Sequence, residues 1–326
     1  MGRKKRRAAI LFVPLLLGCS LFAQTSLASN DDGKNPIFRA KTDLVSLNVT
    51  VIDRKKQPVP DLKKEDSVVY EDGKPQNIAF FTHEQRPASW GLVLDRSGSM
   101  RGVMEDVYKA ALHSIESGTP EDETLAMTFS DKPELVQPFT SDRLALLRSI
   151  SGLTAGGDTA LYDAGALALD YMKTARHKKR VLVIVTDGEY TASSIGFKKF
   201  LNMALRSEIL IYTVGFFDPM ETSYVRAHSF GPNSFLGFGF GFASSRKQLE
   251  QLADETGGLA YFPKNMDECI RAHRDIALQV SQQYSLGYYL SNTNRDEKRR
   301  QIKVKVLRSA NLVVHNRKSY FASHPE

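Results

Sequence analysis

The chain has 326 residues, of which 42% are hydrophobic, 10% aromatic and 25% charged, with 22 glycines and 13 prolines. This composition excludes a disordered chain, a collagen-like repeat and a small disulfide scaffold, and the length allows about two domains. The formal charge is +7, but five basic residues lie together at Arg3–Arg7, and residues 29–326 carry 39 basic and 37 acidic residues. This near-neutral remainder argues against a nucleic-acid-binding protein.

Residues 1–28 have the pattern of a secretory signal. The basic cluster precedes an apolar stretch, Ala8–Gly18, that is too short to span a membrane. Ser26-Leu27-Ala28 matches the small-x-small pattern that signal peptidase cleaves, whereas Leu16-Leu17-Gly18-Cys19 resembles a lipoprotein box in which Cys19 is lipidated. Both alternatives stay open, and both predict an exported protein: periplasmic, attached to the outer membrane, or secreted. Membrane contact is expected only through a lipid at Cys19, and Cys269 then has no disulfide partner within the chain.

Residues 36–85 have the pattern of β-strands. Apolar residues occupy every second position from Val45 to Val51, as in a strand with one exposed face. Val68–Glu71, the Asp72-Gly73 turn and Ile78–Phe81 then predict a hairpin.

Residues 86–283 alternate short apolar runs with amphipathic stretches, which is typical of a parallel sheet covered by helices on both faces. The predicted strands are Trp90–Leu94, Leu125–Phe129, Val181–Thr186, Ile209–Phe217 and Leu259–Phe262. The predicted helices are Val103–Ser117, Leu161–Ala175, Gln248–Glu255 and Met266–Gln283. The predicted fold class is therefore α/β, with a Rossmann-like, doubly wound and mainly parallel sheet.

Residues 284–321 return to strand patterns, at Tyr284–Leu290, Ile302–Leu307 and Leu312–Val314. A few strands at each end of the chain are marginal as separate sheets. We therefore expect residues 284–321 to pair with residues 36–85 in a small β-sandwich-like module that flanks the α/β domain.

Polar residues follow two of the predicted parallel strands and precede a helix. The set comprises Asp95, Ser97, Ser99, Thr159 and Asp187. Because the carboxyl ends of parallel strands meet at one edge of the sheet, where α/β folds bind ligands, these side chains are expected to lie together. An all-oxygen set suits a hard cation, Mg²⁺ first and Mn²⁺ or Ca²⁺ as alternatives. With only two carboxylates, the ion would keep enough charge to bind a carboxylate of a partner protein or peptide.

The order and spacing of these residues resemble the metal-ion-dependent adhesion site of von Willebrand factor A domains, over roughly residues 89–283. The whole chain resembles bacterial secreted proteins that contain this domain. The resemblance implies that Ser97 and Ser99 ligate the metal directly, Asp95 and Asp187 directly or through water, and Thr159 in the ligand-bound state. The competing interpretation is that Asp95, Ser97 or Ser99 caps the following helix without a metal.

A glycine- and phenylalanine-rich stretch, residues 218–244, separates the strand ending at Phe217 from the next predicted helix. Loops of this length are uncommon. One hypothesis makes it an apolar rim beside the metal, where Phe235, Phe238 and Phe240 contact the partner. The alternative is a loop that packs on itself.

Two functions fit this sequence. The favoured one is a noncatalytic, divalent-cation-dependent binding module of the bacterial cell envelope. The alternative is a metal-assisted hydrolase acting on a phosphate or ester, which would need a general base, and His228 is the only loop histidine expected on the metal face.

Overall fold

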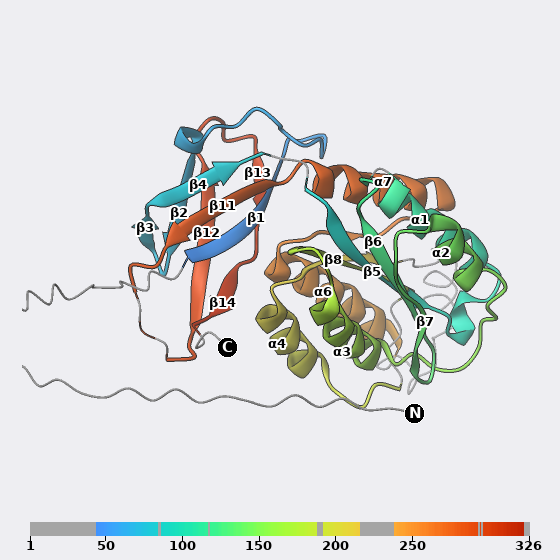
Figure 1. Cartoon of the computed structure of the whole chain (residues 1–326). Coiled ribbons are helices and arrows are strands. Elements are labelled where there is room, and N and C mark those ends of the chain that lie inside the picture. The colour runs from blue at the N-terminus through green and yellow to red at the C-terminus, as the bar shows by residue number, and fades with distance from the viewer. Residues whose placement is uncertain are drawn as a thin grey trace, which may run out of the picture. The chain divides into compact units, whose positions relative to one another are not determined.

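The computed structural model describes residues 44–83, 86–116, 118–187, 192–215, 238–292, 294 and 296–322, with side chains from residue 244 onward in the segment that begins at 238. These residues form one six-stranded and two four-stranded sheets (Figure 1). The predicted signal, including Cys19, lies outside the described residues. Within these ranges no helix combines the length and the apolar character that crossing a membrane requires.

The six-stranded sheet has the order β10-β9-β8-β5-β6-β7. Every neighbouring pair in it is parallel except β6 with β7. Strands β5, β6 and β9 are buried at every position, as expected for strands covered on both faces. The bounds are β5 (Ala88–Asp95), β6 (Glu123–Phe129), β7 (Pro133–Thr140), β8 (Lys179–Thr186), β9 (Leu210–Gly215) and β10 (Ala260–Tyr261). The predicted doubly wound, mainly parallel fold class is confirmed.

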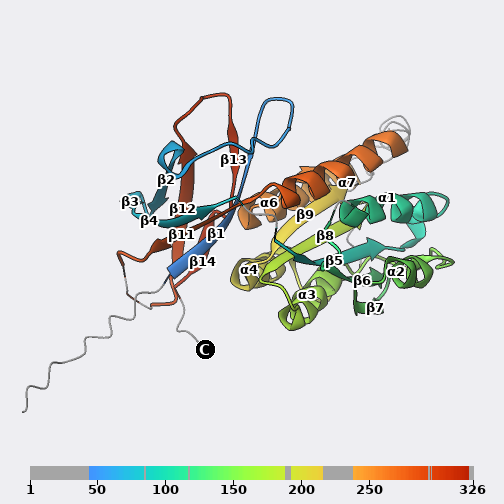
Figure 2. The ribbon, with the colours of Figure 1, turned by 45° about the horizontal axis from the view of Figure 1, so that its top comes forward.

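Helices cover both faces of this sheet. Helices α1 and α7 share one hydrophobic core with the sheet, and α3, α4 and α6 share the other. Figure 2 shows α1 and α7 on one side of the sheet and α3 and α4 on the other. The helices are α1 (Met104–Glu116), α2 (Arg143–Ile150), α3 (Leu161–Tyr171), α4 (Phe197–Ser207), α6 (Phe238–Thr256) and α7 (Met266–Ser281), with 3-10 turns at Lys64–Asp66, Gly98–Met100 and Met172–Thr174. Cys269 on α7 is free and buried.

Four features of this part differ from the prediction. The predicted elements did not include β7, α2 or α4, and the helix predicted at Gln248 begins earlier, at Phe238. Strand β7 was missed because it is a half-exposed edge strand that contains two prolines and lacks a clear apolar alternation. Glycines at alternate positions of the first turns of α6 concealed its start, since glycine disfavours helix.

The N- and C-terminal segments combine into two antiparallel sheets, which we call the β-module. One sheet has the order β13-β1-β11-β4 and the other β14-β12-β2-β3. Each sheet therefore contains strands from both ends of the chain, and one hydrophobic core lies between them. The strands are β1 (Leu44–Ile52), β2 (Ser67–Glu71), β3 (Lys74–Gln76), β4 (Ile78–Thr82), β11 (Tyr284–Tyr289), β12 (Arg299–Val306), β13 (Val313–His315) and β14 (Ser319–Phe321).

The predicted hairpin has a different second strand. Through the turn at Asp72 and Gly73, both with positive φ, β2 pairs with the short β3. Strand β4 instead pairs with β11 in the other sheet. The short polar β3 gave no sequence signal, whereas the apolar β4 did, so the turn was assigned to the wrong partner.

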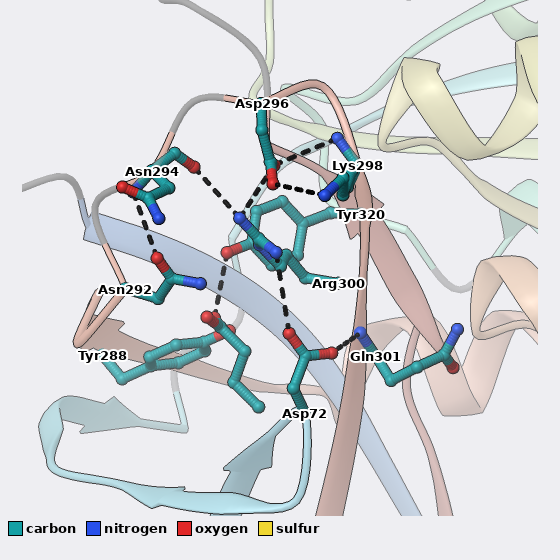
Figure 3. Close-up of polar contacts among 10 residues, drawn as sticks. Asp72, Tyr288, Asn292, Asn294, Asp296, Lys298, Arg300, Gln301 and Tyr320 are labelled. Carbon is teal, nitrogen blue, oxygen red and sulfur yellow. Dashed lines mark hydrogen bonds and ion pairs between the residues drawn. The ribbon is translucent and has the colours of Figure 1, made fainter.

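A buried carboxylate ties the two ends of the chain together. One oxygen of Glu71, Oε2, accepts hydrogen bonds from the hydroxyls of Tyr288 (2.7 Å) and Tyr320 (2.9 Å). Burial, reinforced by Glu71, raises the pKa of both tyrosines, so they remain donors. Beside them Arg300 donates to Asp296 (2.8 Å) and to the carbonyl of residue 294 (Figure 3). Each segment thus supplies the polar partners that the other needs.

Candidate metal centre

The first two carboxylates of the candidate site come from adjacent parallel strands. Strand β5 ends at Asp95, and β8 ends at Thr186, one residue before Asp187. Leu94 of β5 is in register with Val185 of β8. From Trp90 to Leu94 and from Val181 to Val185 the two strands are buried and carry no polar side chain except the indole of Trp90, so the polar residues that follow emerge at the same edge of the sheet.

The carboxylate of Asp95 is held by two hydrogen bonds and is completely buried. Its Oδ1 accepts from the backbone N–H of Ser97 (2.8 Å), and its Oδ2 accepts from the hydroxyl of Thr186 (2.6 Å). The hydroxyl of Tyr108 on α1 donates to the main-chain carbonyl of Asp95 (3.0 Å). The loop after β5 and the end of β8 therefore orient this carboxylate, and α1 holds the main chain of the same residue.

Two carboxylates close together in a buried site repel each other. Burial raises the pKa of Asp95 most, and the charge of Asp187 adds to this effect. The hydrogen bonds from Ser97 and Thr186 lower the pKa, but the net result is a pKa of about 7. Both carboxylate oxygens of Asp187 are themselves shielded from solvent. Such a pair needs a shared proton or a cation to be stable at neutral pH, and a dication would neutralise it.

The hydroxyl of Ser97 lies next to the carboxylate of Asp95. Ser97 is buried and its Oγ lies 3.0 Å from the Oγ of the exposed Ser99. Ser97 is the residue before the 3-10 turn Gly98–Met100, yet its side chain makes no capping hydrogen bond to that turn. This geometry disfavours the capping interpretation for Ser97 and leaves the hydroxyl oriented toward its neighbour.

The loop that carries Thr159 packs against the loop that carries Ser97. The N–H of Gly98 donates to the carbonyl of Gly157 (2.9 Å), and the N–H of Gly156 donates to the carbonyl of Arg96 (2.8 Å). Gly157 has φ +82°, and a Cβ there would lie 2.6 Å from Oδ2 of Asp131, which follows β6, so a side chain would clash with the segment between β6 and β7. Thr159 itself is buried, two residues beyond this contact.

The donor set has the chemistry of a hard-cation site. It offers carboxylate and hydroxyl oxygens, which Mg²⁺ and Ca²⁺ prefer. Within the described ranges no group of three or more His, Cys, Asp and Glu side chains could hold a metal, so any ion bound here would depend on the serine and threonine hydroxyls. The residues present fit a divalent cation that approaches from the side of the exposed Ser99.

Sequence reasoning missed three residues that shape the site: Tyr108, Asp131 and Thr186. Asp131 accepts from the N–H of Asp158 (2.8 Å) and so holds the loop before Thr159. The one available signal was for Thr186, which is the last residue of a predicted strand and directly precedes Asp187. The other two act through contacts between residues distant in the chain.

The residues expected to contact a partner are only partly described. Phe235 and the histidine considered as a base, His228, lie outside the described residues. Phe238 and Phe240 belong to the first turns of α6, not to a loop as predicted, and their side chains are outside the description. The contact role of these phenylalanines therefore stays a hypothesis.

Comparison with known proteins points to one domain family. Residues 91–189 match the family model of the von Willebrand factor type A domain. The human protein "Inter-alpha-trypsin inhibitor heavy chain H4" is 26% identical over 212 residues, which are 61% of this chain and 20% of that protein. An uncharacterised protein of Borreliella burgdorferi is 26% identical over 183 residues, 52% of each chain. The solved "von Willebrand factor type A" structure from Catenulispora acidiphila is 12% identical, with a TM-score of 0.48, over 87% of this chain and 74% of that one.

The family match and the strand order together support a von Willebrand factor type A domain in the α/β part of the chain. The chain spans a fifth of the human relative and about half of the Borreliella protein. The similarity therefore concerns the α/β part, and the activities of those whole proteins do not carry over.

Proposed function

We propose that the α/β part binds one divalent cation, Mg²⁺ first and Mn²⁺ or Ca²⁺ as alternatives, and uses it to bind a carboxylate of a protein or peptide partner. The residues proposed to hold the ion are Asp95, Ser97, Ser99, Thr159 and Asp187. The observation that carries the proposal is the pair of solvent-shielded carboxylates of Asp95 and Asp187, with two hydroxyls 3.0 Å apart beside Asp95. A bound dication would balance the charge of these two neighbouring acids.

The charge of the donor set suggests the partner chemistry. Two carboxylates formally balance a dication, but neutral hydroxyls donate little further charge, so the ion stays a strong acceptor for an additional anionic oxygen. Ser99 is exposed, which leaves one side of the cluster open to an incoming ligand. An aspartate or glutamate of a partner, or a chain terminus, supplies that oxygen.

Metal binding is tested by isothermal titration with Mg²⁺. We expect Ser97→Ala and Asp187→Ala to lose Mg²⁺ binding, and the matched control Ser151→Ala, an exposed serine at the end of α2, to keep it. Unchanged Mg²⁺ affinity in Ser97→Ala and Asp187→Ala would remove these residues from the site. Partner binding is then compared in Mg²⁺ and in chelator, with acidic peptides and their amide counterparts.

The proposed module is noncatalytic, and the same preparation tests this. Hydrolysis would need a general base, and the histidine that the sequence offers, His228, lies outside the described residues. Generic phosphatase and esterase substrates are incubated with the protein and Mg²⁺. Metal-dependent turnover that disappears in Asp187→Ala would assign a hydrolase instead.

Export to the bacterial cell envelope is part of the proposal, and it rests on residues 1–28 alone. Labelling with palmitate separates the two forms. Incorporation that is lost in Cys19→Ala assigns a lipoprotein, and an unlabelled protein whose mature N-terminus follows Ala28 assigns a free exported form. If the protein isolated from its native cells still starts at Met1, both the lipoprotein and the free exported form are contradicted.

A further inference from the structure

An apolar groove lies in the β-module, far along the chain from the candidate metal residues. It has a volume of about 410 Å³ and lies between β12 and β13, with residues of the connecting loop and of the segment before β14 at its two ends. Ile302, Val304 and Val314 line it, together with the exposed Leu307 and Val313, which are 64% and 47% accessible. Exposed apolar side chains around a groove are a common mark of a binding surface.

The groove exists because the C-terminal segment changes sheets. Strand β13 pairs with β1 in one sheet, and β14 pairs with β12 in the other. Strand β14 pairs only with Arg299, Arg300 and Gln301 of β12, and Ile302 bonds to the residue just before β14. Beyond Ile302, no strand of the described residues pairs with β12 on that side. Figure 2 shows the chain leaving β12 through a wide loop and returning as β13 at a distance from it.

The uncovered part of β12 is an open strand edge. Two backbone hydrogen bonds fix the direction of the backbone groups of β12: the N–H of Asp72 donates to the carbonyl of Gln301, and the N–H of Leu307 donates to the carbonyl of residue 66. The N–H and C=O groups of the odd-numbered residues of β12 therefore point toward β2. In an antiparallel strand the even-numbered residues then face the other way. Ile302 does so and donates to the carbonyl of residue 318 (2.7 Å). The backbone N–H and C=O groups of Val304 and Val306 point to the same side as those of Ile302. They have no backbone partner within the described residues, so they can bond to an added strand.

The two faces beside this edge differ in character. On the inner face, Val304 is buried in the core and Val306 packs against it. On the outer face Lys303 and Lys305 are exposed, with the Lys305 ammonium 5.2 Å from the centre of the Tyr70 ring. A third lining lysine, Lys318, is paired with Asp254 at 3.1 Å, and none of the described residues that line the groove is acidic.

Charge complementarity indicates what binds there. Six basic residues of the segment 284–322 are ion-paired: Lys298, Arg299, Arg300, Arg308, Arg317 and Lys318. Lys303 and Lys305 are exposed and form no ion pair within the described residues, so they supply the positive charge beside the groove. A strand added beside β12 would place alternate side chains next to the inner valines and next to Lys303 and Lys305. The peptide side chains beside the valines must be apolar, and acidic side chains are favoured beside Lys303 and Lys305.

We propose that this groove binds an extended peptide segment of a partner protein, with alternating apolar and acidic residues, as an added strand on the edge of β12. The backbone of the peptide pairs with Val304 and Val306, its apolar side chains enter the groove, and its acidic side chains contact Lys303 and Lys305. This site is separate from the proposed metal centre and needs no metal.

The proposal is tested on the full chain with a fluorescein-labelled synthetic peptide of alternating valine and glutamate, and with its valine–lysine counterpart. We expect the wild-type protein to bind the glutamate peptide. The double variant Lys303→Glu/Lys305→Glu should bind it at least about tenfold more weakly and prefer the lysine peptide. The matched control is Lys198→Glu/Lys199→Glu on α4, which makes the same charge change on exposed residues and should bind like the wild type.

Amide hydrogen exchange on the wild-type protein gives a second test, which does not depend on whether a variant folds correctly. Saturating peptide should slow exchange at Val304 and Val306, while the amides of Lys303 and Lys305, already bonded to β2, change little. Absence of binding at millimolar peptide, or binding without protection of Val304 and Val306, overturns the proposal. Protection that rises with protein concentration in the absence of peptide would assign the edge to a second copy and overturn it as well.

Discussion

Removing the charge of Asp95 should stabilise the metal-free protein while it abolishes metal binding. Burial and the neighbouring Asp187 raise the pKa of Asp95 from 3.8 to about 7. In the unfolded chain this carboxyl ionises near its ordinary pKa, so in the folded, metal-free protein its ionised form costs up to about 4 kcal/mol. Asp95→Asn removes that cost and keeps an oxygen that accepts from the N–H of Ser97.

The sign of the pH dependence follows from the direction of the shift. Below pH 3.8 the carboxyl is protonated in both states, and Asp95 causes no loss of stability. As pH rises toward 7 the unfolded state releases its proton first, so the wild type loses stability relative to Asp95→Asn, by about 2 kcal/mol between about pH 5 and pH 7. Above about pH 8 the difference is constant.

The assay is urea denaturation of both proteins in chelator, at about pH 5 and about pH 8. Asp95→Asn should gain on the wild type between the two pH values, because other titrating groups cancel in the comparison. Mg²⁺ should then raise the stability of the wild type and leave the variant unchanged. If Asp95→Asn is no more stable than the wild type at about pH 8 without metal, the two carboxylates do not repel each other as inferred here.

Three further predictions concern residues around the site and in the core. Thr186→Val removes the donor to Oδ2 of Asp95 and should weaken Mg²⁺ binding by about tenfold in isothermal titration, with Thr186→Ser restoring most of it; equal affinity in all three proteins would contradict this role. Gly157→Ala should destabilise the protein by about 1–3 kcal/mol in urea, because its Cβ would lie 2.6 Å from Asp131, and an unchanged denaturation midpoint would show that the loops adjust. Burial lowers the pKa of His273 to about 3, so the unfolded state is protonated first as pH falls. The wild type should therefore lose about 3 kcal/mol relative to His273→Gln between pH 6.5 and about pH 4, and parallel pH profiles in denaturation would show that this histidine titrates normally.

The sequence by itself determined the parts of this protein that are encoded locally. Continuous apolar runs identified the buried parallel strands, and alternation identified β1 and β12, because strand periodicity is a property of neighbouring residues. The polar residues directly after β5 and β8 marked the candidate metal edge for the same reason: a parallel sheet brings the carboxyl ends of its strands to one side.

Only the tertiary structure determined which strands pair with each other and which strand edge stays open. Strand β2 pairs with the polar β3 and not with β4, and β12 keeps an open edge beside Val304. No local pattern contains this information, because a strand presents the same donors and acceptors to every neighbour and only the packing of the whole chain selects among them. The bond from Thr186 to Asp95 and the docking of Gly157 on Gly98 belong to the same class, since they join residues that are distant in the chain and have no sequence signature of their own.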